Sequence, residues 1–408
     1  MPALDEADRV TLGALNTVIV KVASICNLNC SYCYMFNGVD TSFKSQPNFM
    51  DIDTATRIVD RIVEWSEVTG GSDFNLVVHG GEPTLWPVER LAKFADCAAS
   101  APGVDIHLAL QTNGVHFTPA FLDVVNEYSI GLGVSVDGPQ QFNDAYRLDH
   151  AGRGSYRGVM RSVDMLMEHP ASRYFGGFLS VVDTAIPPEK YIDWIQSLPK
   201  RSVDLIWPME VDYDRPPWKR HGLTQLEYSQ SPVYGDWMTK AFDLWFDLGD
   251  PGVRIMMFEE IIRLLVGVGG SHSDDLVNRS LSGFVINSSG SYEYHDYVRN
   301  AYDGACRTGL DVTRNSFAEF MRDPVLASYL SLDQLIPSEC AECPVIDVCG
   351  GGFVTGRLSA SSGRPMPVGR SVLCFDHYSL ITHIIDRIAP VVSTDIISEF
   401  SPEAFSMV

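Results

Sequence analysis

Three cysteines within eight residues, Cys26, Cys30 and Cys33 in the run CNLNCSYC, constrain this 408-residue chain more than any other feature. They follow the apolar stretch at 17–23 (TVIVKVA), whose length and composition predict a buried strand. In α/β proteins the chemistry lies on loops at the C-terminal ends of parallel strands, so we expect the cysteines at such an edge. Three thiolates are one ligand short of the four that close a structural zinc or iron–sulfur site. The sequence therefore predicts a metal centre with one open position.

Structural zinc and disulfide bonds are the alternatives for this cysteine run. Zinc ligand pairs usually come as C-x2-C with a second pair downstream, whereas the spacing here is x3 and then x2. Residues 1–10 (MPALDEADRV) are acidic and polar, without the apolar core of an export signal. We therefore expect the protein in the cytoplasm, where its thiols stay reduced and available to a metal.

Length and composition bound the architecture and exclude two classes of partner. A chain of 408 residues predicts two domains, or one large domain with an appendage. No segment has 18 uninterrupted apolar residues, so we expect no contact with a membrane through a spanning helix. The formal net charge of −22 argues against a nucleic-acid partner, because nucleic acid needs a basic footprint on the protein.

Strand-like and helix-like segments alternate from residue 17 to about residue 250. This alternation predicts a parallel sheet wound right-handedly, either an open doubly wound sheet or a partial barrel. The pattern then changes, and GFVINSSGSYEYHD at 283–296 predicts a hairpin that turns at Ser289 and Gly290. We therefore expect two domains, at 1–250 and 251–408. The predicted strands are 17–23, 74–79, 105–111, 130–136, 177–182 and 203–207, and the predicted helices are 54–68, 87–99, 119–128, 156–168 and 189–198.

Polar and glycine-rich residues follow three of the predicted strands. The second strand ends in HGGEP at 79–83, the third in QTNG at 111–114 and the fourth in SVDG at 135–138. Paired glycines let a backbone approach a ligand closely and expose its amides. The polar side chains supply donors and acceptors for hydroxyl and amine groups. Each motif alone is typical of an ordinary turn, but all three are predicted at the same end of one sheet as the cysteines.

With these motifs in place, the chain resembles the radical S-adenosylmethionine (SAM) enzymes. The resemblance lies in Cys26-x3-Cys30-x2-Cys33 with an aromatic residue before the last cysteine, and in GGEP at 80–83. It implies a partial (β/α)6 TIM-like barrel and a [4Fe–4S] cluster on the three cysteines, with SAM chelating the fourth iron. It also implies cleavage of SAM to methionine and a 5′-deoxyadenosyl radical. The implied SAM-binding residues are Tyr32, Gly80, Gly81, Glu82, Pro83, Gln111, Asn113, Ser135, Asp137 and Arg147.

The C-terminal cysteines extend this resemblance. Cys340-x2-Cys343-x5-Cys349, followed by three glycines and then by Cys374, resembles the SPASM domain of peptide-modifying radical SAM enzymes. Four thiolates can close one auxiliary [4Fe–4S] cluster with no open position. Structural zinc bound by the same four cysteines is the alternative.

Two positions of a second auxiliary cluster depart from the family pattern. Phe353 and His295 stand where the resemblance places cysteines, so we expect one auxiliary cluster and two [4Fe–4S] clusters in all. His295 as a surviving ligand stays open. Of the remaining cysteines, Cys97 in LAKFADCAAS is expected to be a core thiol and Cys306 a buried structural thiol.

Over most of its length the chain is also similar to the FxsB-like branch of radical SAM/SPASM maturases. The similarity includes VDLIWPMEVDYDRPPW at 203–218 and CPVIDVCGGG at 343–352, while Gly356 and Leu358 depart from the branch pattern. The branch implies a ribosomally made precursor peptide as substrate and a ferredoxin- or flavodoxin-type electron donor. It further implies a cyclophane crosslink between an aromatic ring carbon and a side-chain β-carbon. The alternatives are a thioether crosslink, epimerisation, Ser/Cys oxidation, or an iron–sulfur electron carrier or redox sensor without substrate chemistry.

A crosslink of this kind requires a base. After the β-carbon radical adds to the ring, aromaticity returns with the loss of one electron and one proton. The auxiliary cluster or the SAM-binding cluster is expected to accept the electron. Glu210, Asp212 and Asp214 follow the sixth predicted strand and form the expected base region, although acidic loop residues are also typical of a solvated surface.

Overall fold

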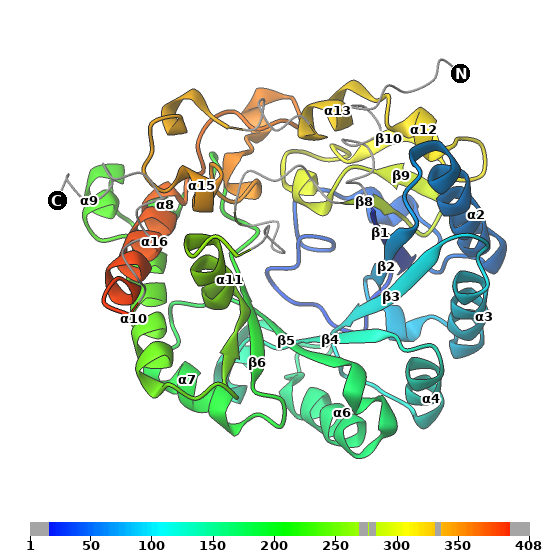
Figure 1. The fold of residues 1–408 in the computed structure, drawn as a ribbon, viewed down its shortest axis with the longest axis horizontal. Coiled ribbons are helices and arrows are strands. Elements are labelled where there is room, and N and C mark those ends of the chain that lie inside the picture. The colour runs from blue at the N-terminus through cyan, green and yellow to red at the C-terminus, as the bar shows by residue number, and fades with distance from the viewer. Residues whose placement is uncertain (1–15, 269–275, 277–282, 331–335, 392–408) are drawn as a thin grey trace. The chain divides into compact units, whose positions relative to one another are not determined.

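The computed structural model describes residues 16–268, 276, 283–330 and 336–391 (Figure 1). The chain divides into two compact units. Within the described ranges there is no helix both long and apolar enough to cross a membrane. The first unit contains Met1–Val136, Asn143–Gly177 and Leu281–Leu330, and the second contains Asp137–Phe142, Phe178–Ser280 and Ser331–Val408.

A mostly parallel sheet forms the centre of the first unit, with the strand order β10-β9-β8-β1-β2-β3-β4. The first predicted strand pairs in parallel with the second, with Val20 opposite Val78. Val18, Val20 and Val22 are at most 2 % exposed, which explains the apolar character of the sequence before the cysteines. The strands are β1 (Thr17–Ala23), β2 (Asp73–Gly80), β3 (Asp105–Thr112), β4 (Gly131–Ser135), β8 (Gly283–Ile286), β9 (Ser291–Glu293) and β10 (Arg307–Asp311).

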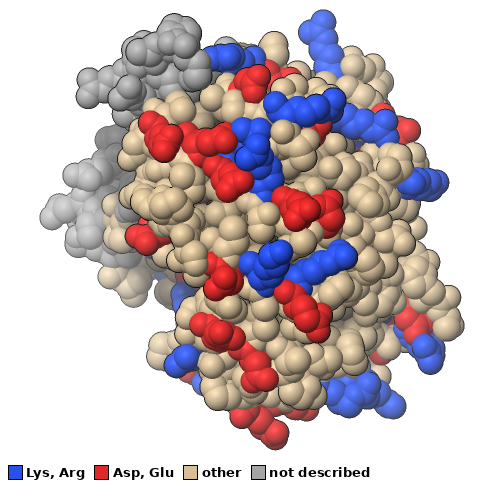
Figure 2. All heavy atoms as spheres, turned by 90° about the vertical axis from the view of Figure 1, so that its right-hand side faces the viewer, with Lys and Arg blue, Asp and Glu red and all other residues tan. Residues whose placement is uncertain are grey.

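Amphipathic helices pack against the strands of this unit (Figure 1). The longest begins at the cap Asp51, whose carboxylate accepts a hydrogen bond from the Thr54 N–H at 2.8 Å, and ends at Gly70 with φ 78°. On the face shown in Figure 2, Lys and Arg side chains are interspersed with Asp and Glu. The helical segments are α2 (Ile52–Thr69), α3 (Val88–Ala99), α4 (Pro119–Glu127), α6 (Tyr156–Glu168), α12 (Phe317–Phe320), α13 (Pro324–Leu330), η1 (Ser42–Ser45), η2 (Pro83–Leu85), η3 (Pro170–Tyr174) and η4 (Asp296–Asn300), while α5 (Gln140–Tyr146) is divided between the two units.

The predicted hairpin is present and extends the first sheet. β8 and β9 are antiparallel and turn at Gly290, which has φ 86°. β8 also pairs in parallel with β1, so that Val18 lies opposite Phe284. The described residues 283–330 therefore group by contact with the first unit, and the functional boundary near residue 250 stays a prediction.

The second unit contains a short parallel sheet and a packed set of helices. β5 pairs with β6, with Leu179 opposite Asp204, and β6 pairs with β7. The Trp237 indole N–H on α10 donates to the Ile186 carbonyl at 2.6 Å, just before α7. The elements are β5 (Phe175–Val181, whose first three residues belong to the first unit), β6 (Ser202–Ile206), β7 (Arg254–Ile255), α7 (Pro188–Ser197), α8 (Pro217–Arg220), α9 (Gln225–Gln230), α10 (Val233–Leu248), α11 (Met256–Leu265), α15 (Ile346–Cys349), α16 (Cys374–Ile388), η5 (Ser338–Cys340), η6 (Thr355–Arg357) and η7 (Ala360–Ser362).

Asp204 on β6 predicts how stability depends on pH. Burial, together with the nearby Glu260 carboxylate, raises the pKa of Asp204 from 3.8 to about 6. Because the folded state then binds more protons than the unfolded chain between these values, stability falls as pH rises from about 4 to about 6. We expect Asp204→Asn to remove this loss and to be about 3 kcal/mol more stable than the parent protein at pH 7. Urea unfolding at pH 4 and pH 7 measures the effect, and the exposed Asp193→Asn is the control. An equal pH dependence in parent and Asp204→Asn would contradict the assignment.

Candidate functional site

The three N-terminal cysteines lie on the loop that follows β1, as the sequence predicts, and all are half-buried. The Cys33 N–H donates to the Cys30 carbonyl at 3.0 Å, and the Leu28 N–H lies 3.3 Å from Cys26 Sγ. Burial raises the pKa of Cys26 to about 12. The hydrogen bond from the Leu28 N–H acts to lower this pKa, whereas the charges of Glu82, Cys30 and Cys33 raise it further. Three sulfurs that repel one another as thiolates need a positive centre, which a metal supplies.

Gly80 and Gly81 fix this loop against the end of β2. The Gly81 N–H donates to the Ala23 carbonyl at 2.7 Å, and the Glu82 N–H donates to the Ile25 carbonyl at 2.9 Å. A Cβ at Gly80 would lie 2.4 Å from the Ala23 oxygen, and one at Gly81 would lie 2.2 Å from the Ile25 oxygen. The two glycines therefore permit a close approach between backbones. Their environment differs from the sequence-based expectation in one respect, because the amides at 81 and 82 bind the cysteine loop instead of being exposed.

Gly81→Ala is therefore expected to displace the cysteine loop. The added methyl group would meet backbone atoms of Ile25, which cannot move without shifting the loop, so we expect a loss of about 1–3 kcal/mol in stability and most of the bound iron. Thermal unfolding and iron content after anaerobic reconstitution measure both effects. Gly71→Ala is the matched control, because its nearest neighbour outside the adjacent residues is 3.5 Å away. Unchanged iron content in Gly81→Ala would refute the anchoring role.

The Glu82 carboxylate joins the motifs that follow β2 and β3. It accepts hydrogen bonds from the Thr112 hydroxyl at 2.6 Å, the Asn113 N–H at 2.8 Å and the Thr84 hydroxyl at 2.7 Å. Burial raises the pKa of Glu82, although these hydrogen bonds act to lower it. The Asn113 amide in turn donates to Asn27 Oδ1 at 2.7 Å, within the cysteine loop. The two motifs and the cysteine loop are thus brought together, as predicted.

Five further predicted SAM-binding residues lie in three settings. The Gln111 amide donates to the Ser135 hydroxyl at 2.9 Å, which links the ends of β3 and β4. The Arg147 guanidinium donates to the Tyr32 hydroxyl at 2.7 Å, directly before Cys33. Asp137 belongs to the second unit, where its carboxylate accepts a hydrogen bond from the Val181 N–H at 3.1 Å.

The predicted base region follows β6 and is largely held in local interactions. Asp212 accepts hydrogen bonds from the N–H groups of Asp214 and Arg215, and Asp214 accepts one from the Ala360 N–H at 2.7 Å. Glu210 Oε1 pairs with Arg220 at 2.6 Å. The second oxygen of Glu210 is buried and, in the part of the chain that the structure describes, has no hydrogen-bond partner. Of the three carboxylates, Glu210 is therefore the one with a buried oxygen that no described residue hydrogen-bonds.

The four C-terminal cysteines share one electrostatic environment in the second unit. Burial raises the pKa of Cys349 to about 12, and the charges of Cys374, Cys343 and Cys340 raise it further. The Cys343 N–H donates to the Cys340 carbonyl at 3.0 Å, which forms the tight turn of the C-x2-C pair. None of the nine cysteines forms a disulfide.

A run of three glycines connects Cys349 to the rest of this cysteine set. Gly350, Gly351 and Gly352 have φ values of 61°, 93° and 82°, so three consecutive residues adopt the left-handed conformation that favours glycine. A Cβ at Gly351 would lie 2.9 Å from Pro337. The glycine run is therefore required by backbone conformation and by space.

Donor chemistry at both cysteine sets fits iron–sulfur clusters. Each set offers thiols alone, the ligands such clusters use, and bound iron favours the thiolate form that burial otherwise opposes. Among the described residues, no three His, Cys, Asp or Glu side chains are placed to hold a single metal ion.

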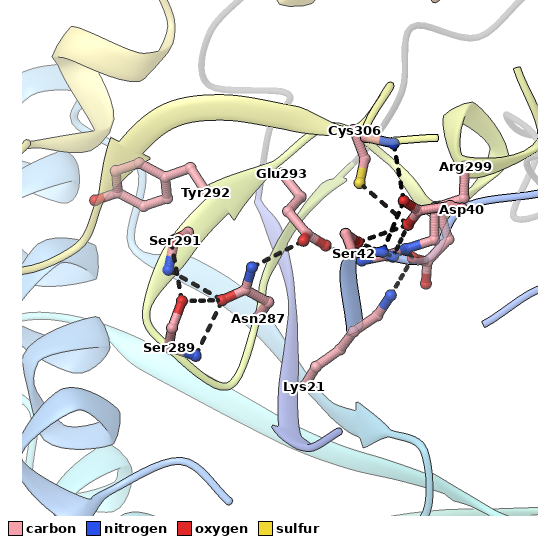
Figure 3. Close-up of polar contacts among 12 residues, drawn as sticks. Lys21, Asp40, Ser42, Asn287, Ser289, Ser291, Tyr292, Glu293, Arg299 and Cys306 are labelled. Atoms are coloured by element: carbon pink, nitrogen blue, oxygen red, sulfur yellow. Dashed lines mark hydrogen bonds and ion pairs between the residues drawn. The ribbon is translucent and has the colours of Figure 1, made fainter. Parts of the chain in front are cut away.

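A buried ionic network in the first unit was not predicted from the sequence (Figure 3). Lys21 on β1 is 2 % exposed and forms an ion pair with Asp296. The Tyr34 hydroxyl, one residue after Cys33, also donates to Asp296 at 3.0 Å. Arg299 pairs with Asp296 at 3.1 Å and with two further carboxylates. Burial acts to raise the pKa of Asp296, but the charges of Lys21 and Arg299 hold this pKa well below its usual range.

The other carboxylates of this network are Asp40 and Glu293, each ion-paired with Arg299. Cys306, whose thiol lies 3.7 Å from Asp40, is fully buried as predicted, and burial raises its pKa to about 12. Cys97 is half-buried on α3, less than the core thiol expected. His295 caps η4, with its ring 4.0 Å from that of Tyr297.

Part of this chain matches a known protein family, and most of its length is similar to known enzymes. Residues 20–183 match the radical SAM superfamily. The chain is 24 % identical over 390 residues to a cysteine-type anaerobic sulfatase-maturating enzyme of Clostridium novyi, covering 93 % of this chain and 98 % of the relative. It is 22 % identical over 389 residues to a serine-type enzyme of the same name from Bacteroides thetaiotaomicron, covering 91 % and 89 %.

Solved structures show the same fold. Native anSMEcpe with bound AdoMet superposes with a TM-score of 0.77 at 20 % identity, covering 92 % of this chain and 98 % of the other. Streptococcus suis SuiB bound to its precursor peptide SuiA gives a TM-score of 0.51 at 13 % identity, covering 88 % and 75 %. These matches confirm the predicted α/β class with a parallel sheet.

Proposed function

We propose that this enzyme, whose residues 20–183 match the radical SAM superfamily, modifies a ribosomally made precursor peptide by joining an aromatic ring carbon to a side-chain β-carbon. The observation that carries the proposal is the anchored loop of Cys26, Cys30 and Cys33, whose three thiols leave one ligand position open. The separate set of four thiols in the second unit supports redox chemistry beyond SAM cleavage.

We assign the SAM-binding [4Fe–4S] cluster to the three cysteines of the loop. Cluster and SAM together supply a carbon radical that takes a hydrogen atom from an unactivated carbon. Gly80 and Gly81 hold the loop in place, and Glu82 fixes the neighbouring strand ends. The proposed SAM contacts are Tyr32, Gly80, Gly81, Glu82, Pro83, Gln111, Asn113, Ser135, Asp137 and Arg147.

Oxidation of the cyclised peptide is assigned to the C-terminal cysteines and to a base after β6. The four thiols of Cys340, Cys343, Cys349 and Cys374 would hold one auxiliary [4Fe–4S] cluster, which would supply an acceptor for the electron. Glu210 takes the proton, because its second oxygen is buried and unpaired within the described residues. The electron donor is proposed to be a ferredoxin or flavodoxin, and the compartment is the cytoplasm, where thiols remain reduced.

Oxidation of a Ser or Cys side chain is the second candidate function. Two relatives matched over about nine-tenths of this chain are named as serine-type and cysteine-type sulfatase-maturating enzymes. Such a reaction would use the same three-cysteine loop, so only the product distinguishes it from a crosslink.

Anaerobic assays with reconstituted protein, SAM, dithionite and synthetic peptides test both candidates. The peptides are those encoded by short reading frames beside the gene. Loss of two hydrogens with missing internal fragments in tandem mass spectrometry supports the cyclophane. A product that reacts with a hydrazide probe contains a carbonyl and supports oxidation, whereas an unchanged mass with altered stereochemistry indicates epimerisation. If no 5′-deoxyadenosine forms with any peptide, the proposed enzyme activity is wrong.

A further inference from the structure

A buried histidine–tryptophan pair in the second unit contacts the segment that carries the C-terminal cysteines. His377 lies on α16, nearly one helical turn after Cys374, and Trp207 directly follows β6. Both side chains are about 1 % exposed. Their rings meet edge to face, with centroids 4.7 Å apart and an angle of 88° between the planes. The pair thus connects the end of β6 to the helix that begins with the fourth cysteine.

His377 also fills the space beside the glycine turn that follows Cys349. A Cβ at Gly352 would lie 2.7 Å from His377 Nδ1 and 2.9 Å from Cε1. The imidazole therefore lies against the backbone that follows Cys349, and it is nearly one helical turn after Cys374. The imidazole thus contacts the glycine turn that follows Cys349 and lies on the helix that begins at Cys374.

The polar atoms of this pair lack partners. In the part of the chain that the structure describes, neither ring nitrogen of His377 has a hydrogen-bond partner, and the Trp207 indole nitrogen has none. Leaving a buried polar group unpaired costs about 1–3 kcal/mol, and native proteins rarely do so. Burial lowers the pKa of His377 to about 3, so its ring is neutral and carries one N–H donor. A donor in this position calls for an acceptor that the described residues do not supply.

We propose that His377 donates a ring N–H hydrogen bond to a sulfur of the auxiliary cluster held by Cys340, Cys343, Cys349 and Cys374, and thereby raises its reduction potential. The inference rests on the proposed function, because it needs that cluster. An N–H dipole aimed at a cluster sulfur stabilises the reduced cluster, which carries one more negative charge. Trp207 keeps the imidazole in this orientation through the edge-to-face contact.

Raising this potential favours the oxidative step of the proposed reaction. Once the carbon–carbon bond has formed, the cyclised radical gives one electron to the oxidised cluster and one proton to the base. The cluster is reduced by one electron, and the ring regains its aromaticity. His377 takes part only through the cluster and is therefore a positioning residue.

The test measures the potential of the auxiliary cluster alone. In a full-length protein with Cys26, Cys30 and Cys33 replaced by alanine, a redox titration followed by electron paramagnetic resonance reports only the C-terminal cluster. His377→Phe keeps a ring against Trp207 but removes the donor. We expect its ratio of reduced to oxidised cluster to fall at least tenfold at a given potential, equivalent to 59 mV for one electron. His377→Gln retains an N–H donor and is expected to restore most of the shift.

A matched control separates this effect from general damage to α16. Tyr228→Phe removes the 2.9 Å hydrogen bond to Asp376, the residue that precedes His377, and leaves the imidazole untouched. We expect it to keep the potential of the parent. An unchanged potential in His377→Phe, or an equal shift in Tyr228→Phe, would overturn the proposal.

A second measurement needs no substitution in α16. With 15N-labelled histidine, the reduced cluster should show a hyperfine coupling to a ring nitrogen, and its absence would overturn the proposal even if His377→Phe fails to fold. If the parent protein with only the C-terminal cysteines binds no iron and sulfide, the proposed auxiliary cluster itself is wrong. The two failures are thus distinguishable.

Discussion

Replacing Cys26, Cys30 and Cys33 together by alanine is expected to reduce SAM cleavage at least about 10³-fold while the protein stays folded. The cofactor carries the hard chemistry, and these three thiols are the cysteines of the loop after β1. Their half-buried side chains contribute little to the core, because the loop is held by backbone hydrogen bonds from Gly81 and Glu82.

Iron content and 5′-deoxyadenosine formation measure this result. With one cluster lost and one retained, iron per chain should fall from about eight to about four atoms. Cys97→Ala is the matched control, because Cys97 is half-buried on α3 and belongs to neither cysteine set. Retained SAM cleavage in the triple variant would mean that the SAM-binding cluster is held elsewhere.

Local pattern predicts most of the elements that carry the site. The six predicted strands and five predicted helices are all present, with each end within two residues of its predicted position. The strand at 17–23 and the helix at 156–168 agree at both ends. Period-2 and period-3.6 patterns succeed here because each element buries one continuous apolar surface. That the motifs at 79–83 and 111–114 lie close together was also predictable, since the carboxyl ends of parallel strands lie at the same edge of the sheet.

Contacts between segments that are far apart in the sequence could not be predicted from local sequence patterns. Lys21 and Asp296 are 275 residues apart, and β8 joins β1 although no local signal predicts their pairing. One signal was present, because a lysine in the middle of the apolar strand TVIVKVA requires a buried carboxylate partner. The sequence does not say which carboxylate, since that choice depends on the tertiary fold.

Arg299→Met is the second substitution with a large expected effect. Arg299 is 2 % exposed and pairs with Asp40, Glu293 and Asp296. Without it, Lys21 is the one cation among the described residues that still forms an ion pair with these three buried carboxylates. Breaking a buried ion pair on one side costs about 3–5 kcal/mol, because the remaining charge is left unpaired. We expect a loss of this size in urea unfolding at pH 7, whereas the exposed pair of Arg57 and Asp60 predicts about 0.5 kcal/mol or less for Arg57→Met.

Neutralising two carboxylates should reverse much of this loss. In Arg299→Met combined with Asp40→Asn and Glu293→Gln, the buried charge that lacks a partner is removed, so we expect at least half of the lost stability to return. No recovery would mean that Arg299 acts through packing of its side chain instead of its charge.

The pH dependence provides an independent check of the same network. Arg299 helps to hold the pKa values of Asp40 and Asp296 below their usual range, against the effect of burial. Carboxylates with lowered folded pKa values contribute stability above the unfolded pKa of 3.8 and lose it as pH falls toward the folded values. In Arg299→Met these pKa values rise, so protonation removes the unpaired charge at higher pH than in the parent. The difference in stability between parent and variant should therefore be largest near pH 7 and shrink toward pH 4. A difference that stays constant over this range would show that the ionic network is not its cause.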